Sequence, residues 1–118
     1  MSSDIELLRD INVELVVRES DGDVDYFRTL LAPAFAMRRA NGSFNNRDEF
    51  LAGVAKSPER RTEEPSVTLY DDTCAVVTCI VSTGAEQEIV RVHNFRLFTR
   101  SDAAAAWRLL AWSNAKLP

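Results

Sequence analysis

The sequence has little of what metal centres and disulfide-stabilised domains require: its 118 residues include one histidine and two cysteines. Cys74 and Cys79 are an odd number of positions apart in one expected strand, so their side chains point to opposite faces and we expect no disulfide. Two thiols without a histidine cluster do not form a zinc site, and we expect neither a metal nor a cofactor. We interpret both cysteines as small buried side chains in a reducing cytoplasm.

Long apolar runs and clustered positive charge are also scarce. No apolar run approaches the ~20 residues that a membrane helix needs, and the polar start Met1-Ser2-Ser3-Asp4 is unlike a secretory signal. The net charge is −4, and the basic pairs Arg38-Arg39 and Arg60-Arg61 do not supply the positive surface that phosphate binding requires. We therefore expect a cytoplasmic protein that binds neither a membrane nor nucleic acid.

Sequence motifs of known catalytic sites are missing as well. The chain has no nucleophile elbow, phosphate-binding loop, dinucleotide-binding fingerprint or zinc-protease motif. Asp71-Asp72 predicts a turn, because aspartate side chains bond to their own backbone in turns. Asp21 and Asp23 flank a glycine but provide too few ligands for a calcium loop. The sequence therefore does not identify a reaction.

What is present is the composition of one globular domain. Apolar residues make up 46% of the chain and charged residues 27%, which is ordinary for a folded protein. A chain of this length buries one core but is too short for two, so we expect a single domain over residues 1–118. The 12 arginines against 2 lysines supply fixed, fork-shaped donors, which suit ion pairs or an anionic ligand.

The first third of the chain predicts helices. Ser3 is a candidate N-cap, and apolar residues recurring with a period near 3.6 predict a helix over residues 4–18. The segment Glu19-Ser20-Asp21-Gly22 is expected to end it. A second, shorter helix follows from Val24 and stops at Pro33, and Asn45-Asn46 offers the cap of a third.

The rest of the chain predicts strands, because it is rich in β-branched and aromatic residues between turn signals. The expected strands cover residues 35–40, 66–71, 74–83, 87–100 and 106–115, with Thr83-Gly84-Ala85 as one break. Helices first and strands afterwards predict an α+β domain with helices on one face of an antiparallel sheet. Val90, Val92 and Phe98 are expected on the other face, which favours a homodimer through this outer face.

The two closing strands carry the candidate site. Alternation places Arg91, His93 and Phe95 on one face, and pairing His93 opposite Trp112 brings Trp112 and Asn114 to the same face. Charged, amide and aromatic groups among apolar ones are typical of a ligand pocket. His93 is the one side chain that exchanges protons near neutral pH unaided. An acid–base role and the role of a half-buried strand histidine are both open for it.

The order of elements resembles the nuclear-transport-factor-two-like superfamily, and within it most closely the SnoaL-like branch. The matching segments are Leu31–Met37 with Asn41-Gly42, Arg47–Leu51, Arg91–Arg96 and Trp107–Asn114. The resemblance implies a cone-shaped α+β domain, a cystatin-like roll in which N-terminal helices pack on a strongly curved antiparallel sheet around an apolar pocket. This superfamily includes isomerases, dehydratases, cyclases, ligand binders and dimerisation modules, so the resemblance predicts the fold better than the function.

Ketosteroid isomerase, which shares that layout, allows a closer comparison. The position of its general-base carboxylate falls at Arg39, and that of its penultimate-strand acid falls at His93, whereas residues 4–18 contain no counterpart of its helix tyrosine. An arginine does not abstract protons at ordinary pH. The resemblance therefore does not carry the isomerase mechanism, but it implies that Arg39 and His93 point into the pocket.

The leading hypothesis is a dimeric domain that binds a small anionic or aromatic molecule. Its expected pocket residues are Arg39, Arg91, His93, Phe95, Trp112 and Asn114. One alternative is a lyase, cyclase or isomerase with His93 as general acid/base and Arg39 or Asn114 steadying an oxyanion. Another alternative is a dimerisation or interaction module with a filled core.

Overall fold

The computed structural model describes residues 3–84 and 88–118, which form three helices and six strands. The helices are α1 (Asp4–Asp21), α2 (Val24–Leu30) and α3 (Arg47–Gly53). The strands are β1 (Leu31–Arg38), β2 (Phe44–Asn46), β3 (Arg60–Asp71), β4 (Cys74–Thr83), β5 (Val90–Thr99) and β6 (Arg108–Lys116). Among the described residues, no helix combines the length and the apolar character that crossing a bilayer requires.

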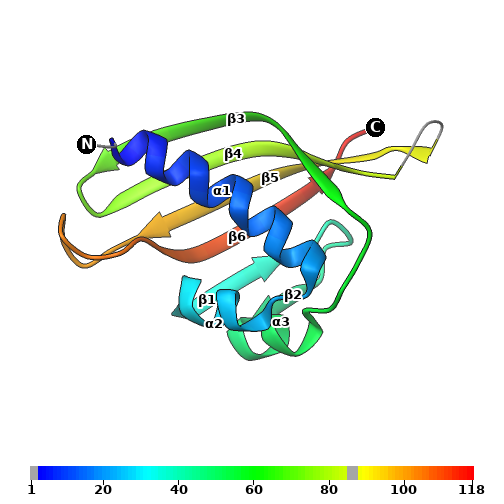
Figure 1. The fold of residues 1–118 in the computed structure, drawn as a ribbon, viewed down its shortest axis with the longest axis horizontal. Coiled ribbons are helices and arrows are strands. Elements are labelled where there is room, and N and C mark those ends of the chain that lie inside the picture. Colours follow the sequence, from blue (N-terminus) through cyan, green and yellow to red (C-terminus); the bar gives the residue numbers. More distant parts are fainter. Residues whose placement is uncertain (1–2, 85–87) are drawn as a thin grey trace.

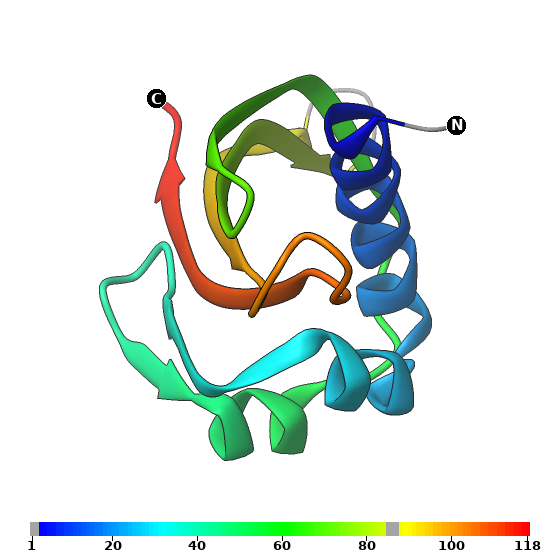
Figure 2. The same ribbon diagram turned by 90° about the vertical axis from the view of Figure 1, so that its left-hand side faces the viewer.

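The six strands form one sheet in the order β2-β1-β6-β5-β4-β3. The expected α+β class is confirmed, but the sheet is mixed rather than purely antiparallel, because β1 pairs with β6 in parallel. The chain passes through α3 and the β3–β4–β5 meander between these two strands, so β6 arrives beside β1 in the same direction. The sheet curves strongly, and α1 lies along its concave side (Figures 1 and 2).

The helix starts were readable from the sequence because side-chain caps set them. Ser3 Oγ accepts a hydrogen bond from the Glu6 N–H at 3.1 Å, as predicted. Asn46 and Glu49 form a reciprocal capping box at the start of α3. The end of α1 was predicted too early: the helix continues through Asp21 and stops at Gly22, whose φ is +74°. A Cβ at Gly22 would lie 2.6 Å from the Lys56 backbone nitrogen, so this close approach requires glycine.

Three strands were longer than predicted or not predicted at all. β1 begins at Leu31 instead of residue 35, so the second helix ends at Leu30 and Pro33 lies within the strand. β3 begins at Arg60 instead of residue 66, because the charged run from Arg60 to Glu64 lies on an edge strand where outward side chains meet solvent. The short edge strand β2 carried no signal of its own. β4 matches its prediction, and β5 begins at Val90. Ala85 of the expected break and the expected strand start at residue 87 lie outside the described residues.

The core lies between α1 and the concave face of the sheet. Leu8, Leu15 and Val16 of α1 are buried there. They share the core with aromatic side chains from both halves of the chain: Phe27, Phe35, Phe50, Phe98, Trp107 and Trp112. Cys79 is buried and Cys74 half-buried, and both are free thiols. Because Phe98 belongs to this aromatic core, it points inward and not to the outer face on which the sequence analysis placed it.

A fully buried arginine lies within this core. Arg96 of β5 donates hydrogen bonds through Nη1 to Asn12 Oδ1 of α1 and through Nη2 to Asn94 Oδ1 at 3.0 Å. Its Nη1 also lies 3.4 Å from Cys79 Sγ, and its guanidinium carbon lies 4.5 Å from the centre of the Trp112 ring. Burial lowers the pKa of Arg96, because it disfavours the charged form. These polar and π contacts stabilise the buried charge, which would be strongly unfavourable in purely apolar surroundings.

We predict that Arg96→Ala lowers the free energy of unfolding by about 3–5 kcal/mol, because it opens a cavity and leaves the buried Oδ1 of Asn12 without its guanidinium donor. Chemical denaturation followed by circular dichroism measures the loss. Arg9→Ala, at an exposed position of α1, is the matched control and should change stability by less than about 0.5 kcal/mol. A similar small change for Arg96→Ala would contradict the stabilising role of the buried guanidinium.

Candidate functional site

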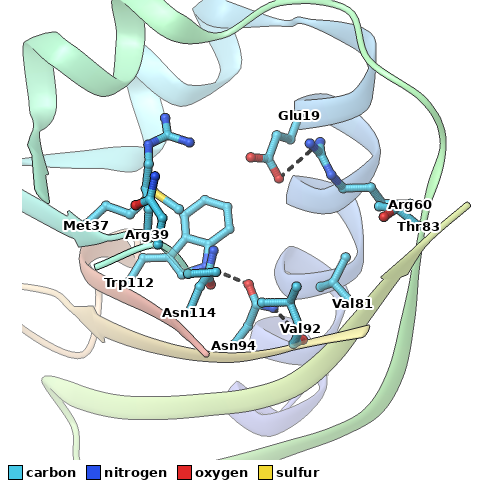
Figure 3. A pocket seen from close by; sticks show the side chains of 12 residues that line it. Glu19, Met37, Arg39, Arg60, Val81, Thr83, Val92, Asn94, Trp112 and Asn114 are labelled. Carbon is cyan, nitrogen blue, oxygen red and sulfur yellow. Dashed lines mark hydrogen bonds and ion pairs between the residues drawn. The ribbon is translucent and has the colours of Figure 1, made fainter. Parts of the chain in front are cut away.

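A cavity of about 380 Å³ lies between the last turns of α1 and the inner face of β5 and β6 (Figure 3). Charged and amide groups occupy much of its wall: Glu19, Arg39, Asn41, Arg60, Asn94 and Asn114. Apolar and aromatic side chains complete it, among them Met37, Val81, Val92 and Trp112. A cavity with convergent polar groups is typical of a small-molecule site, and the large share of polar groups here favours a polar or charged ligand.

Glu19 reaches the cavity because α1 continues past residue 18. Asn12, Leu15 and Glu19 follow one another at helical spacing, so they lie on the same face of α1, toward the sheet. The Ser57 N–H donates to the Ser20 carbonyl at 2.9 Å, which holds this end of the helix against the segment that follows α3. The polar residues that suggested a break thus form the last turn of the helix.

Glu19 and Arg60 form an ion pair in the cavity wall. Their side chains approach to 3.5 Å and are 21% and 26% exposed, respectively. Burial raises the pKa of Glu19, while the positive charges of Arg60, Arg96 and Arg39 oppose this rise. The carboxyl group therefore takes up a proton more readily than a glutamate in solvent.

Arg39 lies on the other side of the cavity, immediately after β1. Its backbone N–H donates to the Ser43 carbonyl at 2.8 Å, which closes the turn that contains Asn41-Gly42. Its Nε donates to Asn45 Oδ1 at 2.7 Å. The turn and this hydrogen bond together fix the direction of the guanidinium, which Figure 3 shows facing the same space as Glu19.

Asn94 and Trp112 form the floor. Trp112 Nε1 donates to Asn94 Oδ1 at 2.7 Å, and Asn94 Nδ2 donates to the Val92 carbonyl at 3.0 Å. Asn114 faces Asn94 across the β5–β6 pair. Its Oδ1 is buried and has no hydrogen-bond partner within the described residues, so it is an acceptor to which a donor group in the cavity could bind.

A second cavity of about 220 Å³ adjoins the first through the same charged groups. Glu19, Arg39 and Arg60 line both spaces, and Phe50, Lys56 and Ser57 border the second one. The three charged side chains therefore stand at the boundary between the two cavities. Within residues 3–84 and 88–118, no cluster of three or more histidine, cysteine or carboxylate side chains could hold a metal ion.

Three of the six predicted site residues, Arg39, Trp112 and Asn114, line the cavity. The predicted register of the closing strands is wrong: Trp112 pairs with Arg96, and His93 pairs with Ala115. The displacement is three residues, an odd number, so it exchanges the two faces of β5 relative to β6. A ligand-binding role for these three stays a prediction.

The other three predicted site residues, Arg91, His93 and Phe95, lie on the outer face of the sheet, because β5 turns Asn94, Arg96 and Phe98 inward. His93 is half-buried beside Ile80 and Ala115 and does not line the cavity. Val92, expected on the outer face, lines the cavity instead.

Sequence reasoning missed Glu19, Arg60 and Asn94. The signal for Glu19 was its position four residues after Leu15 in helical phase, which the polar segment concealed. Asn94 would have been predicted as a site residue if the other face of β5 had been taken as the inner face. Arg60 had no local signal, because it comes from a charged run on an edge strand.

Solved structures of other proteins share this architecture. An NTF2-like protein from Cytophaga hutchinsonii superposes with a TM-score of 0.86 at 12% identity, over 98% of this chain and 100% of that one. An NTF2-like protein of unknown function in nutrient uptake from Rhodospirillum rubrum gives 0.75 at 21% identity, over 88% and 93%. The association domain of CaMKII from C. elegans gives 0.75 at 14% identity, over 92% of each chain.

The sequence matches no protein-family model and no curated protein. The similarity to known proteins is therefore one of three-dimensional fold, and it agrees with the resemblance seen in the order of elements. At identities of 10–21%, these similarities define a shared architecture and not a shared activity. The chain has the NTF2-like, cystatin-like fold.

Proposed function

We propose that the chain is a small-ligand-binding domain whose cavity accepts a small anion, such as a carboxylate attached to an apolar or aromatic group. The observation that carries the proposal is the composition of the cavity wall. Among the described residues that line the cavity, the two guanidinium groups of Arg39 and Arg60 outnumber the one carboxylate, that of Glu19. An arginine fork matches the geometry of a carboxylate and binds it through two parallel hydrogen bonds.

Arg39 is the better placed of the two arginines. Among the described residues its side chain makes one hydrogen bond, through Nε to Asn45. This leaves its two terminal nitrogens for a ligand. Val92, which is half-buried, offers apolar surface in the same cavity, and the nearly buried side chains of Met37 and Trp112 complete the wall. Apolar contact with this wall adds to the affinity for a small aromatic molecule.

We favour a binding function over the alternative that the sequence suggested, which is acid–base catalysis with His93 as the catalytic residue. A general acid or base must come within hydrogen-bond reach of the reacting group. His93 points away from the cavity, on the far side of β5. The proposal therefore assigns the cavity a binding role and does not depend on His93.

Self-association through the outer face of the sheet is a second proposed function, supported by an apolar groove there. The groove measures about 280 Å³ and is lined mainly by Ala36, Phe44, Phe95 and Ala111. Phe44 is 71% exposed and Phe95 41% exposed. Exposed aromatic side chains around an apolar groove are typical of protein interfaces, and a homodimer is the commonest assembly of this kind. One structural neighbour is itself an association domain.

For the binding function we predict that benzoate raises the melting temperature of the chain. At a concentration about ten times Kd the stabilisation is about 1.4 kcal/mol, which corresponds to several degrees for a domain of this size. Arg39→Gln should abolish most of this shift, because it removes the charged fork. His93→Ala, outside the cavity, is the matched control and should keep the shift. Differential scanning fluorimetry measures it, and a broad panel of carboxylates without any shift would overturn the proposal.

For self-association we predict a dimer in sedimentation velocity that the double change Phe44→Asp and Phe95→Asp converts to a monomer, because two charges would be buried in the interface. Tyr70→Asp is the control: Tyr70 is 66% exposed on β3, at the other edge of the sheet from β2. It should leave the dimer intact. A wild-type chain that sediments as a monomer at about 100 μM, far above the Kd of a stable dimer, would contradict the proposal.

A further inference from the structure

We infer that Glu19 determines the charge of the anion that the cavity accepts. Ionised Glu19 lowers the affinity for a dianion relative to a monoanion of the same shape, and neutral Glu19 removes this penalty. The inference rests on the proposed anion-binding function of the cavity, and it assigns a specificity-determining role to a residue within it.

The arrangement of charges around Glu19 leads to this inference. Arg60 of β3 approaches its carboxylate to 3.5 Å. Arg39, after β1, lines the same two cavities, and Lys56, after α3, lines the second cavity. Arg96 of β5 acts on Glu19 through its charge, but its terminal nitrogens are held by Asn12, Cys79 and Asn94 in the core. Among the described residues that line the first cavity, Glu19 is the only acid.

The charge of Glu19 sets the difference between the two anions. Arg39 and Arg60 in the wall attract an anion, and Arg96 behind the wall adds positive charge. Ionised Glu19 repels the second negative charge of a dianion in a partly buried place. Neutral Glu19 removes this repulsion, and the positive charges then favour the dianion more strongly.

The titration of Glu19 gives the same selectivity a dependence on pH. Because burial raises the pKa of Glu19, the neutral form is populated at pH values where an exposed glutamate is still ionised. As the pH falls toward this raised pKa, the neutral fraction grows and the relative affinity for a dianion should rise. At pH values well above it, Glu19 is fully ionised and the penalty on a dianion should reach a constant value.

Three probes of nearly identical shape separate charge from fit: terephthalamide is neutral, 4-carbamoylbenzoate carries one negative charge, and terephthalate carries two. At about pH 8 all their carboxyl groups are ionised, because benzoic acids titrate near the usual carboxyl pKa of about 4. Isothermal titration calorimetry gives the Kd of each. The ratio of the Kd of terephthalate to that of 4-carbamoylbenzoate is the measured quantity, and terephthalamide shows whether a substitution alters the shape of the cavity.

We expect Glu19→Gln to lower this ratio at about pH 8 on the order of tenfold, because the repulsion of the second negative charge is lost. Glu19→Asp, which keeps the charge, should leave the ratio near its wild-type value. Glu14→Gln is the matched control, because Glu14 is a 47%-exposed residue of the same helix that pairs with Arg18 outside the cavity. It should leave the ratio at its wild-type value.

The outcomes separate the inference from the function on which it rests. If Glu19→Gln binds 4-carbamoylbenzoate with an unchanged ratio, the inference is wrong and the anion site stands. If wild type binds none of the three probes, the anion site itself is wrong, and the inference falls with it. Should Glu19→Gln fail to fold, the wild-type ratio is measured across the pH range in which NMR shows the Glu19 carboxyl group to titrate: a ratio that falls as the pH falls supports the inference, and a constant ratio overturns it.

Discussion

The buried guanidinium of Arg96 is the constraint on which the rest of the structure depends. A charge without access to water is tolerated only where hydrogen bonds and favourable contacts replace its hydration. The groups that do so come from four elements: Asn12 of α1, Cys79 of β4, Asn94 of β5 and Trp112 of β6. Satisfying Arg96 therefore requires α1 to cross the sheet at one place and the three strands to pair in one register.

The hydrogen bonds of Arg96 also determine the shape of the cavity. Asn94 Oδ1 accepts hydrogen bonds from both Arg96 and the Trp112 indole, so the group that holds the buried charge also orients the aromatic floor of the cavity. On α1, Asn12 and Glu19 lie two helical turns apart on one face. The same placement of the helix thus brings Asn12 to the core arginine and Glu19 to the cavity wall.

The sequence revealed the features that depend on local signals. The caps at Ser3 and Asn46 and the β-branched run of β4 define their elements without reference to the rest of the chain. The parallel β1–β6 pairing and the register of β5 against β6 depend on contacts between distant segments. A register shift between Leu97 and Phe98 further separates the observed pairing from a simple hairpin.

The candidate site shows the same division. Arg39 followed from the resemblance to ketosteroid isomerase. Trp112 and Asn114 were selected through a pairing with His93 that is wrong, although both residues line the cavity. The face of β5 could not be chosen from alternation alone, because both faces carry polar and apolar residues. Arginine side chains are usually exposed. The burial of Arg96 is explained only by the hydrogen-bonding and aromatic partners that the fold brings to it. Glu19 was hidden because its helix ends at the close approach of Gly22 to Lys56, a tertiary contact.

The central claim is that the cavity beside Trp112 binds an anion through its arginines. A crystal structure of the chain with 4-bromobenzoate tests it most directly, because the anomalous signal of bromine locates the ligand independently of its shape. We expect one bromine peak in the cavity, with the carboxylate within about 3 Å of guanidinium nitrogens of Arg39 or Arg60. A cavity without ligand, or a carboxylate bound only on the outer face of the sheet, would contradict it.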